Sequence, residues 1–420
     1  MNQPQPTAAK FDVQACRQKF PALGRTHNGQ PAVYFDGPAG SQVPESVIEA
    51  MADYMRNANA NHGGVFATSR ESDAMLAEAH RAAADFVGTD DASCVAFGVN
   101  MTTLVLALSR ALARTWKQGD EVMVTRLDHD ANVSPWVLAA EDAGAVVRHV
   151  DVHREDCTLD MEDFQRKLSD RTRMVAVGCA SNATGTINPV AEICRLAHAA
   201  GAEVCLDAVH YAPHRLIDVA AWDCDFLLCS AYKFFGPHVG LLWGKKARMA
   251  ELPVYKVRPA SNNLPDRWMT GTQSHEGIAG VVAAIEYLAD LGRSTTGKEL
   301  SRRQALVAAF EAIEIHERTL LTALLAGLSE MPEITVWGIR DPQRFDQRVP
   351  TLGVTHSRVN PEELAQHLAD RGIFVWHGNF YALPLTETLG LEPQGMVRIG
   401  LLHYNDASEV QRLLDALREL

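Results

Sequence analysis

The sequence predicts an α/β protein whose large domain is built on a mostly parallel, seven-stranded sheet, followed by a smaller α+β domain at the C-terminus. The 420 residues exceed the usual size of one hydrophobic core. Between about residues 94 and 243 short apolar runs alternate with amphipathic stretches, which is typical of strands joined by helices. After about residue 290 a long helical stretch and separated short strands replace this alternation. The expected parts are an N-terminal segment at 1–30 that packs with the small domain, a large domain at 31–290 and a small domain at 291–420.

Seven short apolar runs are the strand candidates of the large domain. They lie at 94–97, 121–125, 146–150, 174–178, 204–207, 226–230 and 239–243. Amphipathic stretches between them predict helices at 102–116, 135–143, 161–168 and 190–200. The small domain is expected to hold a helix at 299–328 that could be broken near Glu317, strands at 334–337, 351–354, 374–376 and 397–401, and helices at 362–370 and 407–419. Ligands of such sheets bind beyond the carboxyl ends of the strands, so the residues that follow each strand are the site candidates.

Composition and charge exclude several classes of function. A net charge of −13 argues against nucleic acid or anionic lipid as the main partner, although one local basic pocket remains compatible with it. No apolar run approaches the roughly 20 residues that span a bilayer, and the first six residues lack the features of a secretory signal. The eight cysteines show neither a CxxC pair nor zinc spacing, so we expect reduced, buried thiols and no metal. These features predict a cytoplasmic protein with no membrane partner, and the first ten residues are expected to be mobile.

Two charged residues at strand ends carry the strongest chemical signal. Lys233 follows an apolar strand, in the turn Ser230-Ala231-Tyr232-Lys233-Phe234-Phe235-Gly236-Pro237. A lysine in such a cleft can lose its proton through burial and nearby cations and then act as a Schiff-base nucleophile, although a solvated loop lysine is commoner. Asp207 ends an earlier apolar strand, where it could pair with the pyridinium nitrogen of pyridoxal 5′-phosphate or cap a helix equally well.

Three further strand-end turns contain groups suited to the same ligand. The turn from Phe97 to Thr103 precedes a predicted helix, whose first N–H groups favour a phosphate, although N-capping by Asn100 or Thr102 is the commoner explanation. His129 could stack on a flat ring, and Asn182 could bind a cofactor hydroxyl, while a surface histidine and a plain turn are the simpler alternatives. Each signal is weak alone, but their order along five strand ends is specific. No GxGxxG follows the first strand, which weakens a nicotinamide-dependent alternative.

With these motifs in this order, the chain resembles the class V aminotransferase family of fold-type I pyridoxal phosphate enzymes, especially its cysteine desulfurase and selenocysteine lyase branch. The resemblance extends from about Tyr34 to the C-terminus. It rests on Tyr34-Phe35-Asp36-Gly37-Pro38-Ala39-Gly40, Asp128-His129-Asp130-Ala131-Asn132, Ser181-Asn182-Ala183-Thr184-Gly185-Thr186, Asp207-Ala208-Val209-His210, Ser230-Ala231-Tyr232-Lys233, Thr270-Gly271-Thr272-Gln273 and Val397-Arg398-Ile399.

The resemblance implies a role for each matching position. Lys233 would form the Schiff base with the cofactor, Asp207 would pair with the pyridinium nitrogen, and His129 would stack on the ring. Asn182 would contact the ring hydroxyl, and Arg398 would bind the substrate α-carboxylate through its planar guanidinium. The expected phosphate-binding residues are Asn100, Met101, Ser230 and Thr272 of the neighbouring subunit, and the remaining substrate-binding candidates are Ala39, His62 and His377. The contact from Thr272 makes a homodimer the expected functional unit.

Three positions depart from the pattern of the desulfurase branch. His210 stands where a glutamine is usual, and it could bind the ring hydroxyl or shuttle a proton. Tyr232 replaces a histidine just before the lysine and could still bind the phosphate. In the stretch 376–382, Tyr381 occupies the position of the nucleophilic cysteine, and no cysteine occurs after Cys229. A phenol cannot accept sulfur as a persulfide. Tyr381 and His377 are therefore interpreted as groups that shape the pocket or donate a proton, with simple packing equally compatible.

These inferences predict a pyridoxal phosphate enzyme that acts on an α-amino acid, by Cβ lyase chemistry without a persulfide cysteine. Both C–S bond cleavage and β-decarboxylation fit. The alternative within the same cofactor class is an aminotransferase or an epimerase. From other classes, a nicotinamide-dependent oxidoreductase lacks its glycine fingerprint, and a protein that keeps the fold for binding only is expected to have lost the lysine or the aspartate, which this chain retains.

Overall fold

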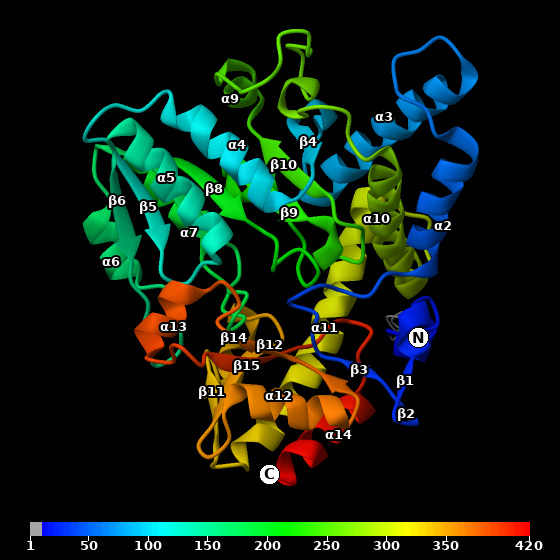
Figure 1. Ribbon diagram of the computed structural model, residues 1–420, viewed down its shortest axis with the longest axis vertical. Coiled ribbons are helices and arrows are strands. Elements are labelled where there is room, and N and C mark those ends of the chain that lie inside the picture. The colour runs from blue at the N-terminus through cyan, green and yellow to red at the C-terminus, as the bar shows by residue number, and fades with distance from the viewer. Residues whose placement is uncertain (1–10) are drawn as a thin grey trace, which may run out of the picture.

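A seven-stranded sheet forms the centre of the large domain in the computed structural model, which describes residues 11–420 (Figure 1). The strand order is β4-β10-β9-β8-β7-β5-β6. The strands are β4 Val95–Gly98, β5 Glu121–Thr125, β6 Val146–Val150, β7 Thr172–Gly178, β8 Glu203–Asp207, β9 Phe226–Ser230 and β10 Gly240–Gly244. Within this sheet β10 runs opposite to the other six strands, which share one direction. The predicted α/β class and the mostly parallel sheet are confirmed, whereas the expected mobility of the first ten residues concerns a segment outside the described part.

Helices cover both faces of this sheet, which explains why its strands are continuous apolar runs. Val122 and Val124 of β5 pack in one core with α4 (Met101–Ala113) and α5 (Ser134–Ala143). Met123, between them, points into the opposite core. The helices that contribute to that second core are α3 Ala67–Val87, α6 Met161–Lys167, α7 Val190–Ala199, α10 His275–Thr296 and the first half of α11 Arg302–Ser329. A strand buried on both faces is built mainly from apolar side chains, and its buried polar residues lie at the strand ends.

Several helices differ from the sequence prediction. The pattern did not indicate α2 (Glu45–Asp53), α3 or α10, and α10 crosses the boundary expected at residue 290. The helix α11 is continuous through Glu317, so of the two alternatives for this stretch the unbroken helix is the one observed. The Glu317 carboxylate is buried and lies 2.9 Å from His214 Nδ1, so this charged residue has a partner inside the core and the helix continues through it. The remaining short helices are α1 Val13–Arg17, α8 Val219–Trp222 and α9 Lys246–Glu251.

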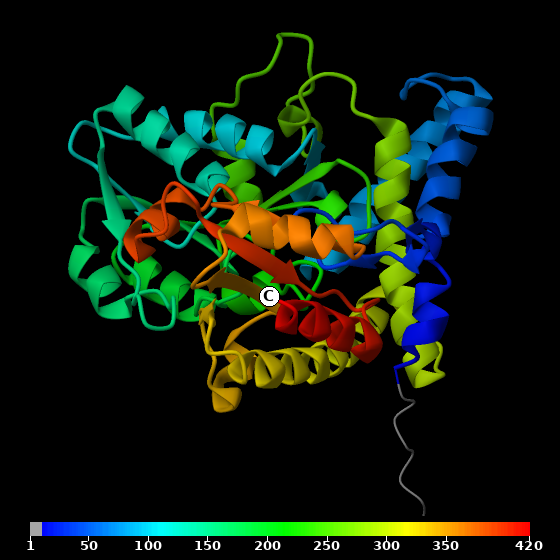
Figure 2. The ribbon, with the colours of Figure 1, turned by 60° about the horizontal axis from the view of Figure 1, so that its bottom comes forward.

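The small domain is built on a four-stranded antiparallel sheet in the order β11-β12-β15-β14 (Figure 2). Its strands are β11 Ile334–Trp337, β12 Thr351–His356, β14 Trp376–Gly378 and β15 Met396–Gly400, and its helices are α12 Pro361–Asp370, α13 Leu383–Leu389 and α14 Ala407–Arg418. The single strand predicted at 374–376 is wrong. The chain changes partner there, because β13 (Ile373–Phe374) pairs with β3 (Val33–Tyr34), whereas β14 pairs with β15.

The N-terminal segment contacts the C-terminal part of the chain. It contains the short hairpin β1 (Thr26–His27) and β2 (Gln30–Pro31). Arg17 donates a hydrogen bond to the Tyr404 carbonyl at 2.7 Å and pairs with Glu409 at 2.9 Å. All eight cysteines are buried and free, as expected. Among residues 11–420, no helix combines the length and the apolar character that crossing a bilayer requires.

Candidate active site

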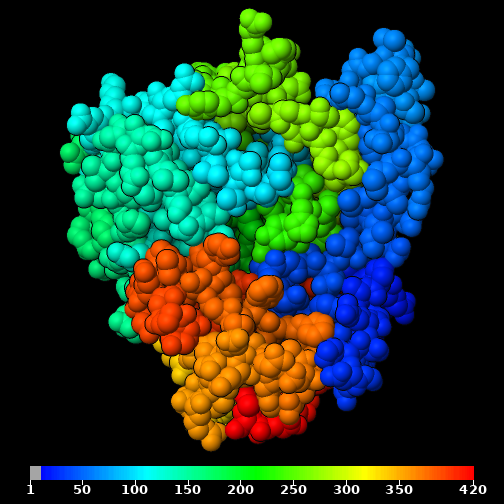
Figure 3. All heavy atoms as spheres, in the orientation of Figure 1, coloured from blue at the N-terminus to red at the C-terminus, as the bar shows by residue number. Residues whose placement is uncertain are grey.

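Two adjoining cavities open at the carboxyl ends of the large-domain strands, where Figure 3 shows a hollow between the cyan and green segments and the orange small domain. The inner cavity has a volume of about 500 Å³ and is lined by residues that follow β4, β5, β7, β8 and β9. The outer cavity, of about 480 Å³, lies between the segment around Ala39 and the small-domain stretch 376–381. Both cavities share His129, Asn182, Tyr232 and Lys233.

Lys233 lies in the turn directly after β9, with 9% of its surface exposed. Its amine donates a hydrogen bond to the Pro38 carbonyl. Burial, and after it the nearby charge of Arg398, lowers the pKa of Lys233 to about 7. A lysine of this kind is partly unprotonated at neutral pH, and its nitrogen lone pair is then available for reaction.

Two carboxylates face the same cavity from the ends of β8 and β5, which lie on either side of β7 in the sheet. Asp207 accepts a hydrogen bond from the Val209 N–H at 2.8 Å, and burial raises the pKa of its carboxyl to about 6. Asp128 accepts from the Thr125 hydroxyl at 2.6 Å and from the Gly178 N–H at 2.5 Å. Burial raises the pKa of Asp128 to about 7, and the charge of Asp207 contributes to this rise. The negative charge of Asp207 therefore disfavours ionisation of Asp128 in the same buried region.

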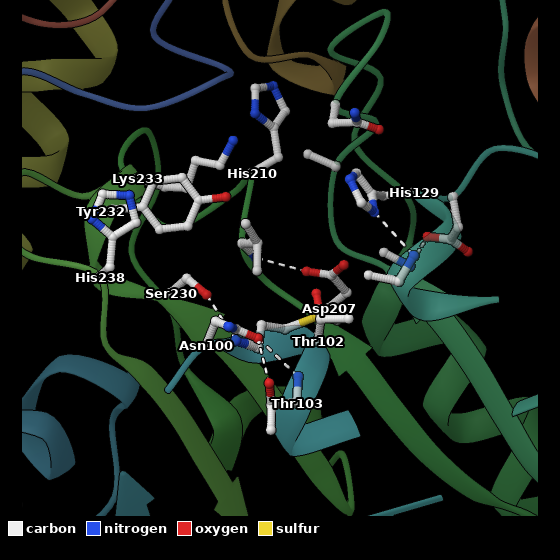
Figure 4. Close-up of a pocket in the computed structure, with 17 residues that line it drawn as sticks. Asn100, Thr102, Thr103, His129, Asp207, His210, Ser230, Tyr232, Lys233 and His238 are labelled. Carbon is white, nitrogen blue, oxygen red and sulfur yellow. Dashed lines mark hydrogen bonds between the residues drawn. The ribbon is translucent and has the colours of Figure 1, made fainter. Parts of the chain in front are cut away.

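The N-terminus of α4 borders the floor of the inner cavity (Figure 4). Asn100 is the N-cap residue, and its side-chain oxygen accepts from the Thr103 N–H at 2.8 Å. The Met101 N–H donates to Ser230 Oγ at 2.9 Å, which joins the helix to the end of β9. Thr102 and Thr103 also line the cavity. The start of this helix is a favourable environment for an anion.

The imidazole of His129 lies at the junction of the two cavities. Its Nδ1 accepts a hydrogen bond from the Ala131 N–H at 3.0 Å, which leaves the proton of the neutral ring on Nε2. Burial lowers the pKa of His129 to about 4, with a smaller contribution from the charge of Lys233. The ring stacks on Tyr381, with centroids 5.3 Å apart. A neutral, flat ring is thus held at the site by contacts from both domains.

Tyr232 and His238 form a second stacked pair in the inner cavity. Their ring centroids lie 4.9 Å apart with an angle of 9° between the planes. Burial raises the pKa of Tyr232, so its phenol stays protonated and can donate a hydrogen bond. Figure 4 shows Tyr232 beside Lys233, with Asp207 and His129 across the same space.

His210 connects the inner cavity to buried polar groups of the small domain. Its Nε2 lies 3.0 Å from Thr351 Oγ1, and its ring meets that of His214 edge-on at 5.5 Å. The Nδ1 of His214 lies 2.9 and 3.1 Å from the two carboxylate oxygens of Glu317. Burial, followed by the charge of His214, holds the pKa of His210 well below its usual value. His210 is therefore a neutral group at the edge of the site.

Arg398 reaches the outer cavity from β15. It donates one hydrogen bond to the Asn182 carbonyl at 3.0 Å, and its guanidinium lies 4.3 Å from the centre of the Phe380 ring. Burial lowers the pKa of Arg398 to about 9. The Asn182 amide donates to the Phe380 carbonyl at 2.9 Å, whereas its buried Oδ1 has no hydrogen-bond partner within the described residues. Both residues retain hydrogen-bonding groups for a ligand.

The structure brings most of the candidate residues together. Ala39 and His377 line the outer cavity with Arg398 and Tyr381. Two candidates lie elsewhere in this chain. His62 lines neither cavity and lies 4.0 Å from Asp73, and Thr272 is an exposed residue of the segment before α10.

Some residues of the site escaped the sequence analysis. Asp128 precedes His129 in one of the motifs described above. Nothing in the sequence indicates that its carboxylate accepts a hydrogen bond from the Gly178 N–H of β7. His238 follows a Gly-Pro pair and carried no signal. Trp376 and Phe380 belong to the small-domain stretch already connected with Tyr381, and their aromatic character was the available indication.

The fold and the residues at the strand ends narrow the class of protein, and comparison with known families identifies it. A family model described as aminotransferase class-V matches residues 33–413, and the chain belongs to this family. It is similar to a cysteine desulfurase of Dickeya dadantii (strain 3937), with 30% identity over 425 residues that cover 98% of this chain and 97% of the relative. It is also similar to a cysteine desulfurase of Enterobacter sp. (strain 638), with 31% identity over 429 residues and 98% of each chain covered.

Solved structures agree with this family and fold. The apo structure of a cysteine desulfurase from Thermococcus onnurineus NA1 has a TM-score of 0.85 and 26% identity, with 97% of each chain covered. A cysteine desulfurase of Escherichia coli, in an S-sulfonic acid form, has a TM-score of 0.82 and 26% identity over 97% of this chain and 98% of that one. The predicted family and its cysteine desulfurase-like character are thereby confirmed.

Proposed function

We propose that this chain is a pyridoxal 5′-phosphate-dependent enzyme that acts on an α-amino acid by Cβ lyase chemistry, either C–S cleavage or β-decarboxylation, without a persulfide cysteine. The observation that carries the proposal is the position of Lys233 and Asp207. Lys233 follows β9, Asp207 is the last residue of the adjacent parallel strand β8, and both line one cavity. An amine that loses its proton near neutral pH and a buried acid are the two groups that this cofactor requires of a protein.

The inner cavity fits the cofactor in size and in its polar groups. Its volume of about 500 Å³ lies in the range of small-molecule sites. The unpaired Oδ1 of Asn182 matches a ring hydroxyl, which can donate a hydrogen bond to it. Ser230, Asn100 and the first turn of α4 would hold the phosphate, while Tyr232 would add a phenolic donor.

When bound, the cofactor supplies an electron-withdrawing ring that stabilises negative charge on the substrate. The carboxylate of Asp207 would accept a hydrogen bond from the ring nitrogen and keep the proton on that atom. Asp128 maintains the orientation of this region by joining the turn after β5 to the Gly178 N–H of β7. The neutral imidazole of His129 offers a flat face for stacking without adding a second positive charge.

The groups that would act on the substrate lie at the outer cavity. Arg398 would bind the α-carboxylate through its guanidinium N–H groups and orient the amino acid. Lys233, near the same cavity, would accept a proton from Cα and return one, because the pKa of about 7 permits both states at neutral pH. His210 is neutral and its ring is held by the contact with Thr351, so it would help to position the ring hydroxyl of the cofactor.

The absence of a persulfide step is supported by the position of the thiols. None of the residues that line the two cavities is a cysteine, and all eight cysteines are buried. Burial raises the pKa of Cys179 and Cys205 well above the usual thiol value, which disfavours the thiolate needed to accept sulfur. Tyr381 lines the outer cavity, and its phenol cannot store sulfane sulfur.

A homodimer with shared sites is part of the proposal. It is supported by the exposed position of Thr272 outside its own cavities and by large apolar side chains exposed on the preceding segment, Tyr255 and Val257. The expected solution mass is twice the 46.0 kDa of one chain. A mass of 46.0 kDa with full activity and bound cofactor would contradict the shared site.

The function is tested by mixing the purified protein with each amino acid and following the visible spectrum of the cofactor. Keto acid, ammonia and sulfide are measured in parallel. Release of ammonia with sulfide, or of carbon dioxide with alanine, supports lyase chemistry. A keto acid formed with the aminated cofactor would instead favour an aminotransferase, and loss of optical activity alone would favour an epimerase.

A further inference from the structure

The outer cavity has an aromatic wall, formed by Trp376, Phe380 and Tyr381. Two of these side chains remain open to solvent, because Trp376 is 53% exposed and Tyr381 is 71% exposed. Large aromatic side chains that line a cavity and remain exposed are available for contact with an apolar group of a ligand.

The backbone holds this wall in one place. Phe380 and Tyr381 both have left-handed φ angles, of 56° and 59°, which residues other than glycine rarely adopt. Hydrogen bonds across the domain boundary stabilise this conformation. Asn182 donates to the Phe380 carbonyl at 2.9 Å, and the Asp130 N–H donates to the Tyr381 carbonyl at 2.7 Å. The aromatic surfaces are thus fixed relative to the inner cavity.

The charges that line the outer cavity limit what a substrate side chain can be. Among residues 11–420, the lysine or arginine residues that line it are Lys233 and Arg398, and no aspartate or glutamate of this range lines it. Under the proposed function, Lys233 reacts and Arg398 binds the α-carboxylate, so no lysine or arginine remains for an acidic side chain. A basic side chain would find no carboxylate either. The cavity thus offers no ion pair to either kind of side chain, whereas its aromatic wall offers contact area to a planar, uncharged one.

We propose that the outer cavity selects α-amino acids with a planar, uncharged side chain, an aromatic ring or a similar conjugated group, that packs against Trp376 and Tyr381. This inference rests on the proposed function and narrows it. It favours C–S cleavage over β-decarboxylation, because β-decarboxylation requires an acidic side chain, for which this cavity has no remaining lysine or arginine. The remaining polar groups of the wall, such as Asn379 and His377, suit a neutral hydrogen-bonding substituent at the far end of the side chain.

The test is a titration of the cofactor-loaded enzyme with L-tryptophan, L-phenylalanine, L-alanine, L-aspartate and L-lysine, followed by the change in cofactor absorption. The expected apparent Kd for the two aromatic amino acids is at least about tenfold lower than for the other three, which is the size expected for aromatic contacts together with buried apolar area. An equal or tighter response to aspartate or lysine would overturn the inference and leave the proposed function intact. No response to any amino acid by a protein that shows the cofactor band would instead contradict the proposed function.

Variants of the wall make the test specific. Trp376→Ala is expected to reduce the preference for aromatic amino acids over alanine by about tenfold, whereas Trp376→Phe keeps a ring and most of the preference. The matched control is Ile315→Ala, an exposed apolar residue of α11 outside both cavities, which is expected to leave all five affinities unchanged. A preference that survives in Trp376→Ala and in Tyr381→Ala would show that the wall does not select the side chain.

Discussion

The rings of His129 and Tyr381 stack across the two domains, with centroids 5.3 Å apart and an angle of 18° between their planes. His129 follows β5 of the large domain, and Tyr381 follows β14 of the small one. Tyr381, which we propose to stand where the desulfurase branch has its nucleophile, therefore contacts a ring of the proposed cofactor site. Its aromatic ring, and not its hydroxyl, makes that contact.

Changing Tyr381 separates the two roles of this residue. Tyr381→Phe keeps the stacked ring, so activity with the best amino acid is expected to stay within about threefold of the original. Tyr381→Ala removes the ring, and we expect weaker cofactor retention, measured by the visible spectrum after dialysis. A loss of about 100-fold in Tyr381→Phe would indicate a proton donor instead. Leu383→Ala, a nearby exposed residue outside both cavities, is the control.

The reaction of Lys233 with free pyridoxal phosphate is expected to depend on pH with a midpoint near 7, because burial lowers the pKa of this amine to about 7. Only the unprotonated amine reacts, so uptake by the cofactor-free protein should be slow at pH 6 and level off above pH 8. Arg398→Met removes a positive charge that lowers this pKa, and the midpoint should move upward. The rate at which the visible band appears, followed as a function of pH, gives the midpoint for the original protein and for Arg398→Met. A midpoint near 10, typical of a solvated lysine, would contradict the assignment.

The buried pair of His214 and Glu317 makes a prediction about stability. Both side chains are 1% exposed, so removing one partner leaves the other polar group buried without compensation. Glu317→Ala is expected to lower the free energy of unfolding by about 3 kcal/mol, measured by denaturant titration. Glu330→Ala, at an exposed carboxylate, should change it by less than about 0.5 kcal/mol. Equal effects of the two substitutions would argue against a paired buried carboxylate.

Incubation with L-cysteine and a mild reductant tests the sulfur chemistry. We expect no protein-bound persulfide and no stoichiometric alanine, because the outer cavity has a phenol where a thiolate is needed and every cysteine is buried. Labelling of thiols followed by mass spectrometry detects a persulfide, and amino-acid analysis detects alanine. Formation of both at about 1 per second or faster would overturn this part of the account.

The large domain was predictable because its strands are buried on both faces. Runs such as 121–125 are buried at every position and have an apolar centre, 122–124, and the polar residues that follow them had to meet at one edge of the sheet. This is why Lys233, Asp207 and His129 could be placed together from the sequence.

Features that depend on tertiary contacts were not predictable in this way. The continuity of the helix at Glu317 could not be predicted, because the buried partner of this residue, His214, is distant in the sequence. The division of the segment 373–378 into two strands arises because β13 pairs with β3 whereas β14 pairs with β15, and these partners are distant in the sequence. The aromatic wall depends on how the small domain lies against the large one, and that arrangement has no local signal. The position of Thr272 relative to a second chain likewise requires the assembly.

The most direct test of the central claim is chemical trapping of the cofactor on the chain. Borohydride reduction of the yellow protein fixes the cofactor to the amine that carries it, and peptide mass spectrometry locates the modified residue. The account predicts modification of Lys233 alone, and loss of both the visible band and the modification in Lys233→Ala. Modification of a different lysine, or an unchanged band in Lys233→Ala, would contradict it.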